Sequence, residues 1–308
     1  MSILSFLLSP PSGITLSEIL LISLVLGLLH GATPDEHTWP ITFSYAIGSY
    51  STKGGMKAGF LFSLGFTFQR ALLTTLGFLG LAYFYIKYNL DGPVYIVVGL
   101  VMAIAGSYVL KGRYIHLPVD VLLGGKKHHS SNASRIPLHE VHEKEIPLRM
   151  TVVHGLIAGF GFGAYATVIT FVLAPMVPSL IYAPLPGIMF GIGTMIMQIL
   201  FGAVFANILK AKKLSESDIK VVARRSAGRT LYYGGAAFAL IGIFVILFPS
   251  LDTFAISTGL GVPNLNTFDM GLLLVLAVVG VIGIGGLIKS YREVVNESHQ
   301  KKINTDSI

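Results

Sequence analysis

Long apolar runs, separated by short polar stretches, divide the 308-residue chain into seven segments. An α-helix needs about 20 apolar residues to cross roughly 30 Å of hydrocarbon. Runs of suitable length cover residues 14–50, 56–86, 93–110, 150–173, 185–209, 230–248 and 270–288. The pattern predicts an all-α, polytopic integral membrane protein with about seven transmembrane helices. The apolar residues 1–9 lack the basic start of a cleaved signal peptide and predict a short interfacial helix.

The amino-acid composition excludes several classes of protein. Hydrophobic residues make up 53% of the chain and charged residues 12%, against about 25% charged in average soluble domains. The absence of cysteine excludes disulfides, iron–sulfur clusters and membrane dithiol relays. No phosphate-binding loop and no His-Glu-x-x-His motif is present, so we expect neither ATP hydrolysis nor an enzyme.

Basic residues predict the orientation of the segments, because short cytoplasmic loops retain Lys and Arg. Of the 22 Lys and Arg residues, 20 fall on one predicted side, in the stretches 53–57, 111–149 and 210–229 and in the C-terminal tail. Lys87 lies on the other side, and Arg70 lies inside the second segment. We therefore expect a plasma-membrane protein with its N-terminus outside and its C-terminus inside. Because the basic residues lie in membrane loops, the net charge of +7 does not indicate a nucleic-acid partner.

Short sequence echoes predict an internal duplication. His30-Gly31 recurs as His154-Gly155, and the motif at 62–65 recurs at 190–193. A three-helix unit duplicated in tandem enters the membrane in opposite orientations, an arrangement typical of secondary transporters. We expect a first repeat at 1–110, a basic His-rich cytoplasmic loop at 111–149, a second repeat at 150–249, and a seventh helix with a cytoplasmic tail at 250–308.

Unusual chemistry is concentrated in residues 30–40 of the first segment. Four ionisable residues stand within eight positions: His30, Asp35, Glu36 and His37. Each costs roughly 2.5 to 3.5 kcal/mol at membrane depth, so such groups normally face a protein interior or a watery cavity. Pro34 and Pro40 cannot donate backbone hydrogen bonds, so we expect the helix to break here. Irregular backbone at such a depth indicates a buried polar site.

These residues form a nitrogen and oxygen ligand set that suits nickel, cobalt, zinc or manganese. His154 is a candidate third imidazole, and Thr33 is a secondary candidate. The metal would be the transported substrate, since no permanently bound cofactor is expected. The alternative interpretation makes His30 and His154 ordinary helix-contact residues and places 35–37 in a cytoplasmic loop.

His30, Asp35 and His37 resemble the His-x4-Asp-His signature of the nickel/cobalt permeases, within the larger group of membrane exporters. Glu36 is inserted between the last two of these residues. The resemblance implies a polytopic transporter with these residues as metal ligands.

Two further stretches are similar to that family. Residues 62–65 look like the start of its Phe-Ser-Leu-Gly-His-Ser motif, with Phe66 at the position of the histidine. Residues 161–164 are similar to its Gly-Phe-Asp-Thr motif, with Gly163 in place of the acid.

Arg70 lies near the middle of the second predicted helix and needs a partner there. An ion pair with Asp35 or Glu36 is the first interpretation, in a structural or coupling role. A second interpretation places Arg70 against an anionic substrate, because its planar fork suits a carboxylate, sulfite or phosphate. Gln198, in the fifth segment, is a further candidate, or an ordinary interhelical hydrogen-bonding residue.

The predicted cytoplasmic loop at 111–149 contains five of the nine histidines: His116, His128, His129, His139 and His142. A solvated linker and a metal-gathering segment are both compatible with their spacing. The second basic loop, 210–229, is typical of a contact with anionic lipids.

The sequence thus predicts a secondary transporter of a divalent transition metal cation, nickel- or cobalt-like, with His30, Asp35, His37 and His154 as ligands. The alternatives are an exporter of an anion or small metabolite centred on Arg70, and a membrane assembly factor without transport. The bilayer and the substrate are the expected partners, and self-association into a homo-oligomer stays open.

Overall fold

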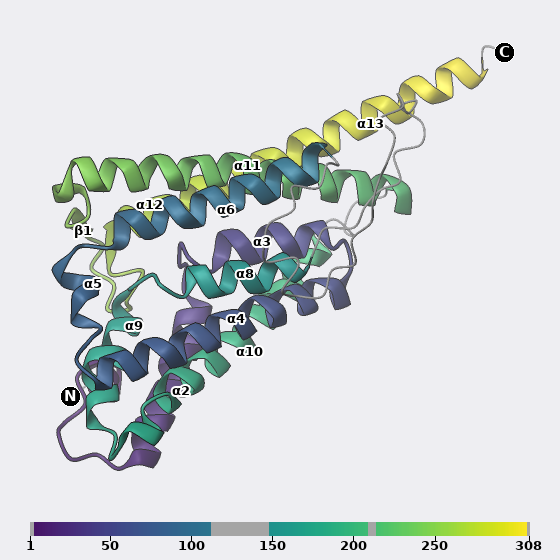
Figure 1. Cartoon of the computed structure of the whole chain (residues 1–308). Helices are drawn as coiled ribbons and strands as arrows, with labels where there is room; N and C mark the ends of the chain where they lie inside the picture. Colours follow the sequence, from purple (N-terminus) through teal and green to yellow (C-terminus); the bar gives the residue numbers. More distant parts are fainter. Residues whose placement is uncertain (1–2, 112–147, 209–213, 307–308) are drawn as a thin grey trace, which may run out of the picture.

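The computed structural model describes residues 3–111, 148–208 and 214–306 and is mostly helical (Figure 1). The first half contains α1 (Ile3–Leu8), α2 (Leu16–Ala32), α3 (Trp39–Gly48), α4 (Thr52–Phe78), α5 (Tyr83–Lys87) and α6 (Asp91–Lys111). The second half contains α8 (Arg149–Ala158), α9 (Ala164–Thr167), η1 (Val168–Leu173), η2 (Ala174–Met176), η3 (Leu180–Tyr182), α10 (Leu185–Asn207), α11 (Glu216–Leu247), η5 (Pro249–Leu251), β1 (Ala255–Ser257), β2 (Thr267–Asp269), α12 (Met270–Val275), η6 (Leu276–Gly283) and α13 (Ile284–Asp306).

The prediction of a helical protein is confirmed, apart from a two-stranded antiparallel sheet that the apolar pattern did not indicate. Strands β1 and β2 pair with Ile256 opposite Phe268, between α11 and α12. The predicted His-rich loop, by contrast, lies largely outside the described residues.

Four helical stretches in the described part of the chain are long and apolar enough to cross a membrane: Asp91–Leu110, Leu180–Asn207, Glu216–Leu247 and Met270–His299. Large apolar side chains such as Leu240, Leu247 and Val281 are exposed on them, as expected for surfaces that face lipid. The protein is therefore membrane-embedded. Seven crossings and the orientation remain predictions.

All seven predicted segments contain helix, but three of them are interrupted. Segment 14–50 is divided into α2 and α3, as its two prolines predict. In segment 56–86, Gly80 adopts a left-handed φ of +72° just after the end of α4. Segment 150–173 is interrupted by a glycine-rich linker at 159–163, between α8 and α9.

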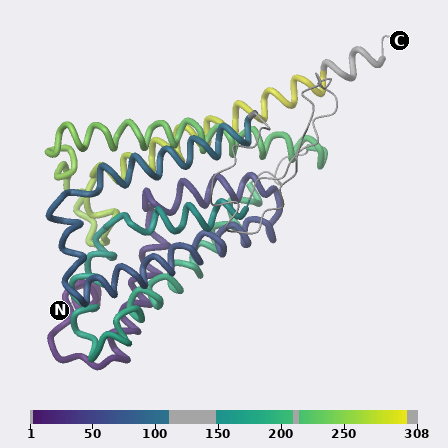
Figure 2. The backbone as a smooth tube through the Cα atoms, viewed as in Figure 1, coloured from purple at the N-terminus to yellow at the C-terminus, as the bar shows by residue number. Residues whose placement is uncertain are grey.

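The helices form two groups with α3 between them (Figure 2). One group contains α6, α11 and the α12–α13 stretch, and the other contains α2, α4, α8 and α10. Helix α3 packs on α11 of the first group and on α4 and α10 of the second. All of its residues from Pro40 to Gly48 are buried.

Small residues bring two antiparallel helix pairs into close backbone contact. In the pair α6–α11, glycine meets glycine at three levels: Gly92 with Gly242, Gly99 with Gly235, and Gly106 with Gly228. These glycines are spaced seven residues apart on each helix, so they share one face. In the pair α4–α10, Gly55 meets Gly202 in the same way. Such contacts are typical of helix packing in membranes.

The contacts between α2 and α10 recur between α8 and α4. Gly27 lies against the carbonyl of Phe190 and Gly193 against that of Leu24. In the second helix pair, Gly155 lies against the carbonyl of Phe62 and Gly65 against that of Val152. Each residue of one set stands 128 positions from its counterpart in the other.

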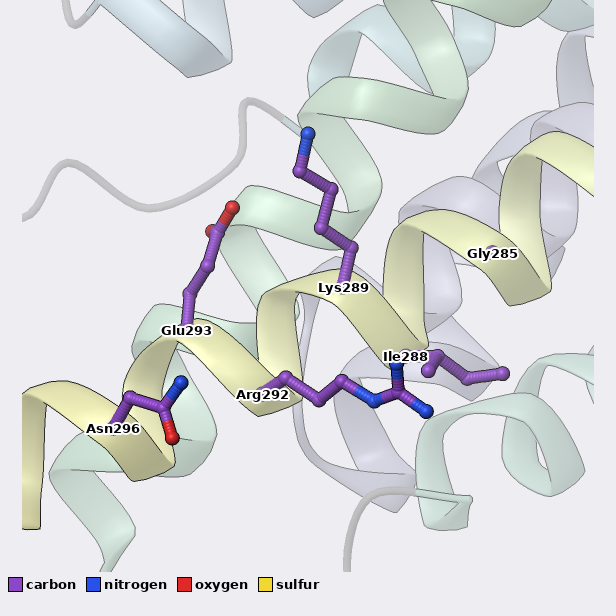
Figure 3. Close-up of a pocket in the computed structure, with 6 residues that line it drawn as sticks. All are labelled: Gly285, Ile288, Lys289, Arg292, Glu293 and Asn296. Carbon is purple, nitrogen blue, oxygen red and sulfur yellow. The ribbon is translucent and has the colours of Figure 1, made fainter.

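Helix α13 is fixed to α11 by ion pairs beyond the apolar part of the bundle. The Arg229 guanidinium donates to both carboxylate oxygens of Glu293, at 2.7 and 2.9 Å. Arg225 bonds Glu297 at 2.8 Å. A surface pocket of about 360 Å³ beside these pairs is lined by Gly285, Ile288, Lys289, Arg292, Glu293 and Asn296 (Figure 3).

Candidate cation site between α2 and α3

The backbone between α2 and α3 forms a tight turn around Asp35. Helix α2 ends at an extended Thr33, with φ −89° and ψ 150°. The Asp35 carboxylate accepts a hydrogen bond from the backbone N–H of His37 at 3.0 Å. The backbone carbonyl of Asp35 accepts hydrogen bonds from the backbone N–H groups of Thr38 and Trp39. This Asx turn places three consecutive ionisable side chains in the gap between two helices.

In the described part of the chain, Asp35, Glu36 and His37 form a group of side chains that could together hold a metal ion. One ligand atom from each lies within 4.8 Å of the others. Asp35 is 2% exposed and His37 is 3% exposed. The side chains of Asp35 and His37 are therefore buried in the protein, and that of Glu36 is partly buried.

His30 lies directly beside this group, at the end of α2. Its Nδ1 atom is 3.5 Å from Oδ2 of Asp35. Its ring packs between Phe66 of α4 and Phe190 of α10, with centroid distances of 5.6 and 5.0 Å. The Nε2 atom is buried without a hydrogen-bond partner among the described residues.

The His37 ring is held between an aromatic ring and a glycine. Tyr95 of α6 stacks on it at 5.4 Å between centroids. A Cβ added at Gly161 would lie nearly equally close to three of the imidazole ring atoms, which places this glycine against the ring face. Nδ1 of His37 is 3.1 Å from Oε1 of Glu36, which also accepts the Tyr95 hydroxyl at 3.3 Å. The buried Nε2 atom of His37 has no described partner.

Arg70 is close to the site but does not form the predicted ion pair with Asp35 or Glu36. Within the described ranges, its side chain donates one hydrogen bond, from Nη2 to the carbonyl of Gly161 at 2.6 Å. The guanidinium carbon lies 4.8 Å from the Phe66 ring centroid. Phe162 and Phe190 each lie 5.8 Å away. Cation–π contacts and one carbonyl thus stand in place of a carboxylate at the guanidinium.

The structure does not bring His154 into the group of ligand atoms. Its Nδ1 lies 2.8 Å from the carbonyl of Met150 and 3.2 Å from the hydroxyl of Tyr45. The histidine ring is oriented by its own helix and by α3 rather than by Asp35. Its Nε2 atom is buried and without a described partner.

The two secondary candidates line the backbone near the site. Gln198 of α10 donates from Nε2 to the carbonyl of Gly31 at 3.4 Å, which is an interhelical hydrogen bond. The Thr33 hydroxyl donates to the carbonyl of Leu29 at 2.9 Å and accepts from Asn264 at 3.2 Å.

Sequence reasoning missed three residues of this site: Tyr95, Gly161 and Asn264. Tyr95 stands in an apolar segment without charge, and Asn264 stands in a polar loop far along the chain, so neither shows a local signal. Gly161 lies in the stretch 161–164, which resembles the family's Gly-Phe-Asp-Thr motif. The acidic residue of that motif corresponds to Gly163 and not to Gly161.

Comparison of the chain with models of protein families, with curated proteins and with solved structures gives no match. The resemblance to nickel/cobalt permeases therefore remains a prediction from short motifs.

Proposed function

We propose that this protein is a secondary membrane transporter of a divalent transition metal cation, nickel- or cobalt-like. The observation that carries the proposal is the buried group of Asp35, Glu36 and His37 at a break between two helices, with His30 beside it. Side chains of this kind are costly in a membrane protein interior unless they bind one another or a substrate.

The geometry leaves nitrogen atoms available for a metal. Glu36 and Asp35 approach the Nδ1 atoms of His37 and His30, respectively. A carboxylate at one ring nitrogen orients an imidazole and raises its basicity as a ligand through the other. The Nε2 atoms of both histidines are buried without described partners. Imidazole nitrogen combined with carboxylate oxygen suits nickel, cobalt, zinc or manganese.

An inverted three-plus-three repeat, with the α12–α13 stretch as an added helix, fits this function. In our proposal the first repeat consists of α2–α3, α4 and α6, and the second of α8–α9–η1, α10 and α11. The recurring contacts at an interval of 128 support it, because each central helix packs on the first half-helix of the other repeat. Both first elements are also interrupted, at 33–38 and at 159–163. Broken helices that face one another near the midplane are the usual sites of secondary transporters.

Within the proposed site, His30, Asp35 and His37 bind the cation, and Glu36 carries the coupling charge. Arg70 is then a nearby fixed positive charge. It repels a cation, and the carboxylates of the site must offset this repulsion when the cation binds. It contacts the Gly161 carbonyl in the second broken element, so it connects the two repeats.

Multi-element mass spectrometry of whole cells tests the proposal without a prior choice of metal. Cells would express the intact chain, a His30→Ala/His37→Ala variant, or the matched control His299→Ala, all at equal membrane abundance. His299 is an exposed histidine of α13. We expect one transition metal to change with the intact chain and with the control but not with the double variant. No change in any element would contradict metal transport and leave the anion exporter centred on Arg70 and the assembly factor as the alternatives.

A second candidate function is export of a small anion, and Arg70 favours it. The side chain is 1% exposed, and its Nε and Nη1 atoms have no hydrogen-bond partner in the described part of the chain. An oxyanion could accept from this free edge of the guanidinium. Efflux of radiolabelled sulfite, phosphate or acetate from proteoliposomes tests it. Efflux that is lost in Arg70→Met and kept in His37→Ala would favour this candidate over the metal.

A further inference from the structure

The connection between β1 and β2 reaches across the molecule to the gap between α2 and α3. Its residue Pro263 is buried, and the carbonyl of Pro263 accepts the hydroxyl of Tyr165 at 3.3 Å. The next residue, Asn264, donates from Nδ2 to Oγ1 of Thr33 at 3.2 Å. Figure 1 shows this connection extending from the level of α11 and α12 towards α9. It covers one side of the candidate site.

The hydrogen bonds of Thr33 agree with the direction of the Asn264 amide. The Thr33 hydroxyl has one proton, and it donates that proton to the carbonyl of Leu29 at 2.9 Å. The Thr33 oxygen can therefore act only as an acceptor toward Asn264. The amide nitrogen faces Thr33, and the amide oxygen, Oδ1, faces away from it.

The Asn264 oxygen faces the same space as a carboxylate oxygen of the site. A Cβ added at Gly163 would lie 3.8 Å from Oδ1 of Asn264 and 3.9 Å from Oδ2 of Asp35. The glycine leaves this position without a side chain, so both oxygens border the space at Gly163. His30 approaches the same Asp35 oxygen from α2, at 3.5 Å.

The backbone at Asn264 is suited to hold this side chain in place. Its φ is +65°, in the left-handed region that asparagine tolerates better than most residues. The conformation and the Thr33 hydrogen bond together fix the direction of the amide.

We propose that Asn264 is a residue of the cation site and supplies a neutral oxygen ligand, Oδ1, from the side of the space at Gly163 that Oδ2 of Asp35 also borders. This inference rests on the proposed cation transport. Carbonyl-type oxygen is a normal partner of carboxylate and imidazole around a divalent cation. A neutral donor adds coordination without a second negative charge next to Asp35. The β1–β2 connection then forms part of the site.

Isothermal titration of the purified full chain in lipid nanodiscs with Ni²⁺, and in parallel with Co²⁺, tests the assignment. Asn264→Gly removes the amide and tolerates the left-handed backbone, and Asn264→Asp keeps the shape and offers oxygen in place of nitrogen. We expect Asn264→Gly to weaken binding by about tenfold or more, on the order of the effect of removing a supporting group at a metal site. Asn264→Asp loses the hydrogen bond to Thr33 but keeps an oxygen at this position, so it should bind the ions more tightly than Asn264→Gly. Leu260→Ala, at an exposed position of the same connection, is the matched control and should bind like the intact chain.

Two results would overturn the assignment while leaving cation binding intact. One is unchanged affinity in Asn264→Gly. The other is equal weakening in Asn264→Gly, Asn264→Asp and Thr33→Val, which would make the amide a latch on Thr33 rather than a ligand. If the intact chain and its Leu260→Ala control bind neither ion, the proposed cation transport fails, and this inference fails with it.

Discussion

The substitution Gly161→Ala would test how the His37 ring is held. The added methyl would lie 2.5 Å from Cδ2 of His37 and nearer still to Cε1 and Nε2. Ordinary van der Waals contact begins at 3.4 Å, so the ring would have to move by about 1 Å. It has little room to do so, because Tyr95 stacks on it and Glu36 lies 3.1 Å from Nδ1.

Two readouts should respond. Overpacking of this kind costs about 1–3 kcal/mol, so we expect a lower thermal unfolding midpoint of the purified protein in detergent. A displacement of about 1 Å at a ligand can reduce activity on the order of 100-fold, so cation transport into proteoliposomes should fall steeply. Gly163→Ala is the matched control for stability, since the nearest atoms to its added methyl lie at 3.8 and 3.9 Å. Equal midpoints for Gly161→Ala and Gly163→Ala would refute the described packing of His37.

Three further predictions follow from contacts elsewhere. His154→Ala should leave cation transport within about twofold of the intact chain, because His154 is oriented by Met150 and Tyr45 rather than by the site. His37→Ala should abolish transport. Loss of transport in both variants would indicate that His154 is a ligand. Gly99→Val should lower the unfolding midpoint, at a cost of about 1–3 kcal/mol, since its side chain would meet the backbone of α11, whereas Gly280→Val, with open space around it, should not; similar midpoints would contradict the α6–α11 contact. Glu293→Gln should weaken the packing of α13 on α11 by about 1 kcal/mol or less, because its arginine partners are partly exposed. Amide hydrogen exchange in α13 should rise more than in the control Glu216→Gln. The same exchange in both variants would show that these ion pairs do not hold α13 on α11.

Local features of the sequence predicted the helical membrane character and the break in the first segment. Both depend on patterns that the chain shows within a few residues, namely long apolar runs and the two prolines, Pro34 and Pro40. The cluster of Asp35, Glu36 and His37 was also predictable, since three adjacent ionisable residues cannot be far apart. Its burial was not, because depth depends on which helices surround the segment.

Long-range pairings were beyond the sequence. The partner of Arg70 proved to be a carbonyl and aromatic rings, and the charge alone could not distinguish these from a carboxylate. The echo between 62–65 and 190–193 spans 128 positions, like the recurring contacts, whereas the echo that matched Gly31 with Gly155 spans 124. The difference is about one helical turn, so a match of two residues cannot fix the register. Asn264 carries no local sign that it will meet Thr33, 231 positions earlier.

The complete burial of α3 has a consequence for how the chain is made. A helix of 10 residues is about 15 Å long, half of what a bilayer crossing requires, and no face of α3 beyond Trp39 is left for lipid. Such a segment is too short to cross the bilayer by itself during synthesis. Its partner α4 follows directly in the chain, but its partners α10 and α11 emerge from the ribosome more than a hundred residues later. The packing of α3 on α10 and α11 therefore forms only after the second half of the protein has been made, so the surroundings of the site are completed late in biogenesis.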